Sequence, residues 1–249
     1  MTNTTLPFFL VLILIILIAG SIFHFSSIKD RFDIRKNPSL LNLHKSIGLS
    51  IEHGKGLHIS LGKSDLNNIH GAASLIGLET LNQIIDQSIL SDNPPVTTVG
   101  SGDLALLAQN KHQNVIIDKS SSPSDLQSHA YLSGATNLSY IAGVIPPSSD
   151  EDLSTQIFVG NIGPEIGLLL DANQKKRHFS LPATDSLEGQ SVSFACSDDA
   201  LIGEEIFAIP AQLSNQSKFK VSLLIQDLLR WLVILIILFV LVIKLVGLL

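Results

Sequence analysis

Residues 56–99 read GLHISLGKSDLNNIHGAASLIGLETLNQIIDQSILSDNPPVTTV, and this stretch decides the fold class. Residues 57–61 form a short β-rich run that ends in a Gly-Lys-Ser-Asp turn. Apolar side chains then recur at helical spacing over residues 70–91, in one wide stripe. Two prolines close this unit before the β-rich residues 96–99. The pattern predicts a strand, a helix and a second strand joined by a crossover.

The same alternation continues to about residue 212. Further strands are expected at residues 114–118, 156–159, 178–181 and 192–196. Further helices are expected at residues 104–111, from about 120–125 to 135, 165–173 and 200–212, whereas 138–144 fits a strand or a helix. Strands that alternate with helices need crossover connections. The sequence therefore predicts an α/β fold, with a Rossmann-like, mostly parallel sheet and helices on both faces.

Both ends of the chain are strongly apolar. Hydrophobic residues make up 45% of the sequence and charged residues only 15%, against about 25% charged in an ordinary soluble domain. Residues 6–25 carry no charge, and residues 228–249 carry only Arg230 and Lys244. About 20 apolar residues in a helix span the hydrocarbon core of a bilayer. We expect a transmembrane helix in each segment. A cleaved signal peptide is the alternative for the first, although no basic residue precedes it.

Basic side chains flank the central part of the chain, which predicts its orientation. Lys29, Arg31, Arg35, Lys36 and Lys45 follow the first segment, and Lys218, Lys220 and Arg230 lie near the start of the second. By the positive-inside rule, the centre is cytoplasmic and both termini lie outside the inner (plasma) membrane. The expected organisation is a span at 6–25, a juxtamembrane segment at 26–50, an α/β domain at 51–213, an amphipathic lead-in at 214–227 and a span at 228–249.

Composition excludes several classes of function. A net charge of −6 without a basic run argues against nucleic acid as a partner. The single cysteine, Cys196, excludes an intramolecular disulfide framework and a thiolate zinc cluster, and it fits a reducing compartment. No metal-ligand spacing is present, so neither a metal nor a cofactor is predicted. The expected partners are the lipid bilayer and either a second copy of the chain or another protein.

Two glycine turns follow predicted strands. They are Gly100-Ser101-Gly102 and Gly160-Asn161-Ile-Gly163. Glycine lets backbone amides approach an anion at a helix N-terminus, so both turns are candidate phosphate or ligand sites. Neither forms a full dinucleotide fingerprint. The alternative is a tight connection in which Ser101 or Asn161 caps the next helix.

Acidic side chains fall in the first turns of the predicted helices. They are Asp103, Asp125, Glu165, Asp198 and Asp199. First turns of this kind lie together at the carboxyl edge of an open parallel sheet, where carboxylates can hold Mg²⁺. Acids at helix starts also complement the helix dipole, which is the simpler explanation for each one singly.

Five stretches carry a resemblance to a known family. They are GLHISLG (56–62), SDNPPVTT (91–98), GNIGPE (160–165), LIGEEIF (201–207) and QDLLRW (226–231). Together they resemble an uncharacterised bacterial membrane-protein family of the Chloroflexota type, known only as a domain of unknown function. The resemblance covers about residues 45–235. It implies a bacterial inner-membrane protein and brings no catalytic residues with it.

Two hypotheses of function follow. The first is a membrane-tethered cytoplasmic α/β module for ligand binding, scaffolding or partner recruitment. The second is a metal-assisted hydrolase or nucleotide-binding enzyme that uses the acids at the carboxyl edge of the sheet. No catalytic motif is present in the sequence, so the catalytic residues are unknown, and fold analogy alone does not choose between the two.

Overall fold

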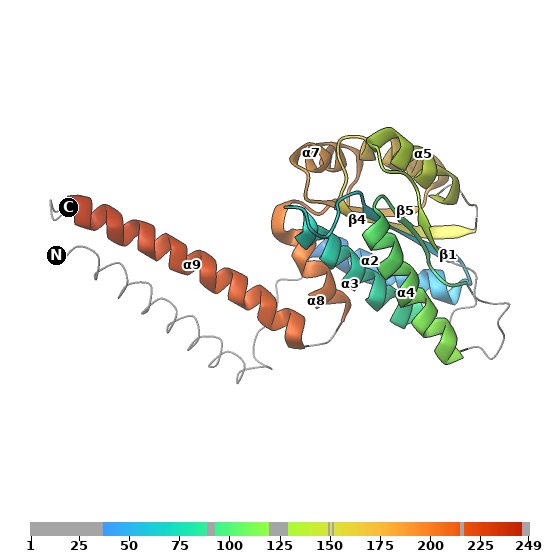
Figure 1. Ribbon diagram of the computed structural model, residues 1–249, viewed down its shortest axis with the longest axis horizontal. Helices are drawn as coiled ribbons and strands as arrows, with labels where there is room; N and C mark the ends of the chain where they lie inside the picture. Colours follow the sequence, from blue (N-terminus) through green and yellow to red (C-terminus); the bar gives the residue numbers. More distant parts are fainter. Residues whose placement is uncertain are drawn as a thin grey trace. The chain divides into compact units, whose positions relative to one another are not determined.

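A parallel sheet organises the chain in the computed structural model, which describes residues 37–88, 93–119, 129–148, 150, 152–214 and 217–245. In these residues, five strands pair in the order β3-β2-β1-β4-β5, each parallel to its neighbour (Figure 1). The strands are β1 Gly56–Gly62, β2 Val96–Val99, β3 Ala130–Leu132, β4 Leu153–Asn161 and β5 Phe179–Thr184. The α/β class is confirmed, as are the strands expected at 57–61, 96–99, 156–159 and 178–181.

The strand order reverses direction beside β1. The chain builds β2 and β3 on one side of β1 and then crosses to build β4 and β5 on the other side. In the middle of β1, Ile59 therefore lies between Thr97 of β2 and Ile157 of β4. Loops that leave β1 and β4 turn to opposite sides of the sheet at this point, which leaves room between them for side chains or a ligand.

Helices cover both faces of the sheet (Figure 1). One face packs against α2, α3, α4 and α8 in a core that includes Ile59, and the other packs against α5, α6 and α7 in a core that includes Phe158. The helices are α2 Pro38–Glu52, α3 Gly71–Gln87, α4 Gly102–Lys119, α5 Asn137–Ser148, α6 Ile166–Lys176, α7 Leu187–Cys196, the 3-10 helix η3 Gly203–Ala208 and α8 Ile209–Leu213.

The unit that contains the sheet runs from Lys36 to Ser214. It includes α2, whose residues the sequence analysis placed mostly in the juxtamembrane segment 26–50. The Asn37 side chain accepts a hydrogen bond from the backbone N–H of Ser39 (3.0 Å), and Pro38 takes the first helical position, so this helix has a well-defined start. Leu43, which is fully buried, joins α2 to the core.

Two expected strands are helical, and those predictions were wrong. Residues 114–118 extend α4. Each residue added to a helix that has already started at Gly102 forms one more backbone hydrogen bond, and this outweighs the small loss of helix propensity of β-branched side chains. Residues 192–196 end α7. Ser186 caps this helix by accepting from the N–H of Gly189 (3.3 Å), and Val192 and Cys196, four residues apart, both pack on the second core.

In three further segments the structure decides or corrects the expectation from the sequence. Residues 138–144, which fitted a strand or a helix, lie in α5. Residues 130–132 form strand β3, so the helix expected to extend to residue 135 was wrong there, whereas residues 120–128 lie outside the described residues. The helix expected at 200–212 is divided into η3 and α8. Pro210 lies at the start of α8, where the missing N–H costs no hydrogen bond.

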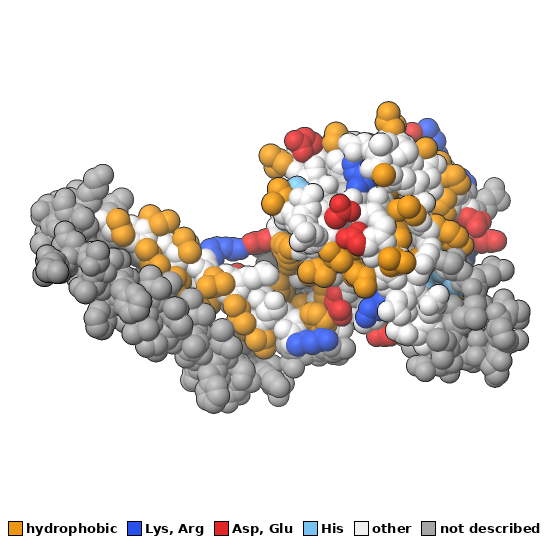
Figure 2. All heavy atoms as spheres, viewed as in Figure 1, with side chains coloured by type: hydrophobic (Ala, Val, Ile, Leu, Met, Phe, Trp, Pro, Cys, Tyr) orange, Lys and Arg blue, Asp and Glu red, His pale blue; other side chains and the backbone are white. Residues whose placement is uncertain are grey.

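A second unit comprises residues 1–35 and 215–249. Its described part is helix α9, Ser217–Leu245, along which Figure 2 shows many apolar side chains. Trp231 and Ile237 are among its exposed side chains. Over the described residues, no helix combines the length and apolarity needed to cross a bilayer, so these residues do not support the span expected at 228–249. The span expected at 6–25 lies outside the described residues.

Gly160 in β4 is predicted to be intolerant of a side chain. Its φ is +130°, and an added Cβ would lie 2.3 Å from the carbonyl oxygen of Leu61. Gly160→Ala should lower the free energy of unfolding by about 2 kcal/mol or more. Gly48, inside α2, has nothing within 4 Å of an added Cβ, so Gly48→Ala should raise it by about 0.5–1 kcal/mol. Urea unfolding of the purified full-length chain, followed by circular dichroism, measures both. Equal effects would contradict this account of β4.

Candidate functional site

A buried ion pair lies at the carboxyl ends of β1 and β4, where the strand order reverses. Lys63 follows β1 and Glu165 lies in the connection between β4 and α6. The Nζ atom of Lys63 is 2.6 Å from Oε1 of Glu165, and the two side chains are only 12% and 7% exposed. Lys63 also donates to the Asn137 side chain at the start of α5. A charged lysine is therefore held at the point where open α/β sheets bind ligands.

The carboxylate of Glu165 is stabilised in its charged form. Burial raises its pKa, but hydrogen bonds from the Lys63 ammonium and the N–H of Gly163, together with the lysine charge, outweigh burial, so the pKa lies below its ordinary value. At neutral pH the site therefore contains a matched pair of charges. The removal of two charges from water costs free energy of folding unless each charge keeps its partner.

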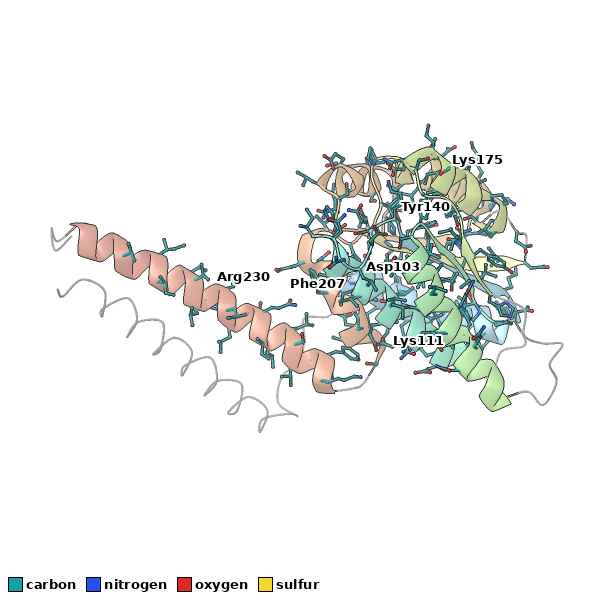
Figure 3. The ribbon with its side chains drawn as sticks, in the orientation of Figure 1. Asp103, Lys111, Tyr140, Lys175, Phe207 and Arg230 are labelled. Carbon is teal, nitrogen blue, oxygen red and sulfur yellow. The ribbon has the colours of Figure 1, made fainter. Side chains whose placement is uncertain are left out.

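Tyr140 joins α5 to the end of β1 (labelled in Figure 3). Its hydroxyl accepts a hydrogen bond from the backbone N–H of Gly62 (3.0 Å) and is hydrogen-bonded to the hydroxyl of Ser60. Burial raises the pKa of Tyr140 to about 12, so the phenol stays neutral. Tyr140 thus holds the turn that presents Lys63.

A second polar group lies beside the first. The Asn161 amide, at the end of β4, donates to Oδ1 of Asp185 (2.8 Å), which follows β5. The other oxygen of Asp185 is 2.6 Å from Nδ1 of His70, before α3. We name Lys63, Asn137, Tyr140, Asn161, Glu165, Asp185 and His70 together the switch-edge cluster.

The predicted glycine turns use their backbone amides within the fold. The N–H of Gly100 donates to the carbonyl of Gly62 (2.8 Å), and the carbonyl of Gly160 accepts from the N–H of Asp185 (3.3 Å). The N–H of Gly163 donates to Glu165, while the Ser101 hydroxyl donates to the carbonyl of Ser64 (3.5 Å). These groups join the connections at the carboxyl edge to one another.

The predicted acids Asp103 and Asp199 bind separate partners. Asp103 accepts from the N–H groups of Leu66 (2.7 Å) and Leu104 (2.8 Å). Burial raises its pKa, but these bonds and one from Ser101 hold the pKa below its usual value. Asp199 accepts instead from the Asn42 side chain on α2 (2.9 Å).

Asp198 and Asp125 are the remaining candidate acids. Asp198 is the sequence neighbour of Asp199, and Asp125 lies outside the described residues. In the part of the chain that the structure describes, no three His, Cys, Asp or Glu side chains form a group that could hold a metal. The structure therefore does not bring Asp103, Glu165, Asp198 and Asp199 together as one metal site.

Most of the switch-edge cluster was not predicted from the sequence. Its one local signal is Gly62-Lys63-Ser64 directly after the first predicted strand, the glycine-lysine-serine order of a phosphate-binding loop without that loop's first glycine. Here the N–H groups of Gly62 and Lys63 donate to Tyr140 and to the carbonyl of Asn161, so this turn is not an open phosphate loop. No spacing in the sequence connects Asn137, Tyr140 or Asp185 with it.

Sequence comparison assigns the family. The model of a family described as "Domain of unknown function (DUF6754)" matches residues 1–249. The chain belongs to this family. The resemblance to a domain of unknown function is therefore confirmed. No curated protein and no solved structure matches the chain.

The contribution of the Lys63–Glu165 ion pair to the free energy of unfolding can be tested. Lys63→Met leaves the Glu165 carboxylate buried without its partner, so it should lower the free energy of unfolding by about 3–5 kcal/mol at neutral pH. The double variant Lys63→Met/Glu165→Leu should lie within about 1 kcal/mol of the wild type, because an apolar pair replaces the two charges. Urea unfolding of the three full-length proteins measures both values.

The pH dependence has a defined sign. In the wild type the folded pKa of Glu165 is lowered, so its stabilisation is present above the unfolded pKa and is lost as the pH falls through the folded value. In Lys63→Met the burial that raises this pKa remains, so acid should reduce the penalty of the substitution. A single variant as stable as the wild type, or a double variant no better than the single, would contradict this role.

Proposed function

We propose that the chain is a membrane-tethered binding module, whose Rossmann-like α/β domain holds a small anionic ligand at the switch-edge cluster. Lys63 is the group that would recognise the anion. The ligand would be bound and not chemically changed, so the module would act as a sensor or recruit a partner.

The observation that carries this proposal is the buried Lys63–Glu165 pair at the reversal of strand order. In open parallel sheets this point is where ligands bind. The Lys63 ammonium has three donors, and Glu165 and Asn137 accept two of them, so the third can bond to a carboxylate or phosphate of a ligand while Glu165 keeps its partner. Asn137, an exposed residue, supplies an amide next to Lys63 that a ligand can reach.

The chemistry of the cluster supports binding over catalysis. A general base works best when its pKa lies near the working pH. The Tyr140 phenol, with a pKa of about 12, stays protonated, and the lowered pKa of Glu165 makes it a weak base. His70 is paired with Asp185, which is itself bonded to Asn161. These contacts favour a fixed polar binding surface.

The proposal of a membrane tether is based on the sequence of the two ends of the chain. Residues 6–25 carry no charge, and residues 228–249 are apolar except for Arg230 and Lys244. Basic residues such as Lys29 and Lys218 lie on the central side of these segments, which supports a cytoplasmic domain with both termini outside. A module held in this way would be confined to the inner surface of the membrane.

Ligand binding is tested by thermal unfolding of the purified full-length chain in neutral detergent. The probes are ADP, NAD⁺ and succinate, which offer phosphate and carboxylate groups on different frames. A probe present at about 100 times its Kd stabilises the folded chain by about 2.7 kcal/mol, so at least one should raise the Tm. The Lys63→Met/Glu165→Leu variant, chosen because it should keep its stability, should respond less than the wild type.

Lys175→Met is the matched control, because it removes the same charge from a side chain that is 72% exposed and outside the cluster. It should respond to the probes as the wild type does. The proposal is wrong if no probe raises the Tm of the wild type, or if the double variant responds as strongly as Lys175→Met.

Tethering predicts a defined fractionation. Expressed in a bacterium, the full-length chain should stay with the membranes after an alkaline carbonate wash and float with lipid in a sucrose gradient, which separates membrane protein from aggregates. Removal of residues 1–25 and 228–249 together should release it. Protease added to spheroplasts should leave the domain intact if it is cytoplasmic. A full-length chain that the wash extracts, or a domain that the protease digests, would contradict the tether or its orientation respectively.

A further inference from the structure

A pocket with several basic side chains lies at the amino ends of β1 and β4, the edge opposite the switch-edge cluster. Its volume is about 370 Å³, and it is lined by Lys55, Leu153, Ser154, Lys176, Arg177 and His178. We name it the amino-edge pocket. Four of these residues are Lys, Arg or His, in a chain with an excess of acids. We propose that the amino-edge pocket binds a phosphate ester.

The basic groups come from separate parts of the chain. Lys55 immediately precedes β1, whereas Lys176 ends α6, and Arg177 and His178 lead into β5. Basic residues in the last turn of a helix commonly complement its dipole, which accounts for Lys175 and Lys176. The dipole of α6 gives no reason for Lys55. The two segments therefore bring basic groups of separate structural origin to one pocket.

Arg177 adopts a conformation that favours glycine. Its φ and ψ are 57° and 31°, the left-handed region, and its N–H donates to the carbonyl of Gln174 (3.1 Å) at the end of α6. A non-glycine residue in this region costs about 1 kcal/mol, and helices usually place glycine there. Arg177 therefore has an unfavourable backbone conformation at the position where its side chain lines the pocket. Backbone strain of this kind clusters at functional sites.

A buried network fixes the ring of His178. The Gln156 amide nitrogen lies 3.2 Å from Nδ1 of His178 and also donates to the carbonyl of Ser148 (2.6 Å), while its oxygen accepts from Asn173 (2.7 Å). Gln156 and Asn173 are at most 1% exposed. Because an amide nitrogen donates only, Nδ1 accepts, and the ring proton of the neutral imidazole lies on Nε2. Burial, Lys176 and Lys55 lower the pKa of His178, which keeps the ring neutral.

These groups match the chemistry of a phosphate ester. A phosphate presents several oxygens that accept short bonds from charged donors, and arginine can bind two of them at once. Lys55, Lys176, Arg177 and the Nε2–H of His178 would supply donors of this kind. No acidic side chain is among the described residues that line the pocket. Its volume also lies in the range of sites for small ligands and exceeds the need of a bare phosphate ion.

The ligand can be a soluble phosphate ester or the headgroup of a phospholipid, which share this chemistry. The experiment uses the purified full-length chain in neutral detergent, with isothermal titration calorimetry. One arm titrates glycerol 3-phosphate, with glycerol as the control. The second titrates detergent micelles that contain phosphatidic acid, with phosphatidylserine micelles as the control for negative charge.

Variants separate recognition from stability. Arg177→Gly should weaken binding about ten- to a hundredfold, as expected for the loss of a charged hydrogen-bond donor, while raising the Tm because glycine accepts the left-handed backbone. A purely structural role of Arg177 would not produce opposite changes in binding and Tm. Lys176→Ala should also weaken binding. Lys175→Ala is its matched control, because the adjacent Lys175 pairs with Asp171 and does not line the pocket.

Binding of glycerol 3-phosphate, of phosphatidic acid or of both, weakened by Arg177→Gly and Lys176→Ala but not by Lys175→Ala, supports the proposal and identifies the source of the ligand. No binding in either arm would overturn it. Equal binding to phosphatidylserine, or an equal loss in Lys175→Ala, would show attraction to charge alone and would also overturn it.

Discussion

The parallel pairing of β1 with β4 is the constraint on which the rest of the structure depends. β1 is the central strand, and β4 is the first strand on the side of β1 opposite β2 and β3. At their carboxyl ends this pairing brings Lys63 to Glu165. At their amino ends it brings Lys55 to Leu153 and the rest of the amino-edge pocket. The two proposed binding regions therefore lie at opposite ends of the same pair of strands.

Buried polar contacts fix the register of β1, the central strand of this pairing. On the α5 face of β1, Nε2 of His58 lies 3.0 Å from the Thr98 hydroxyl of β2, and Ser60 is bonded to Tyr140. Burial lowers the pKa of His58 to about 3, so this ring is neutral inside the sheet. A slip of one residue would turn these groups toward the other core and leave them without partners, at a cost of about 1–3 kcal/mol each.

Much of the fold could be predicted because its signals are local. The β-rich runs at residues 57–61 and 96–99 are bounded by glycine and proline, and each is a strand. Residues 114–118 and 192–196 misled the prediction because β-branched and aromatic side chains favour strands only weakly. In α4 and α7 the start of the helix, at Gly102 and after Ser186, decides the state of the residues that follow.

The site was less predictable because its parts are assembled by topology. Glu165 was a candidate, but the sequence gives no sign that its partner is Lys63, 102 residues away. Asp103 accepts from the N–H of Leu66, which is 37 residues away, and Asp199 accepts from the Asn42 side chain on α2; a single sequence does not reveal such contacts. Likewise, Arg177 in a left-handed conformation is recognisable only from the backbone.

Hydrogen exchange of the full-length chain tests the central role of the β1–β4 pair most directly. If this pair is the constraint, the backbone amides of residues 57–60 and 155–159 should exchange only through global unfolding, and the amides of β3 should exchange faster. Exchange of the β1 or β4 amides through local opening, while the amides of β3 or β5 remain protected, would contradict the account.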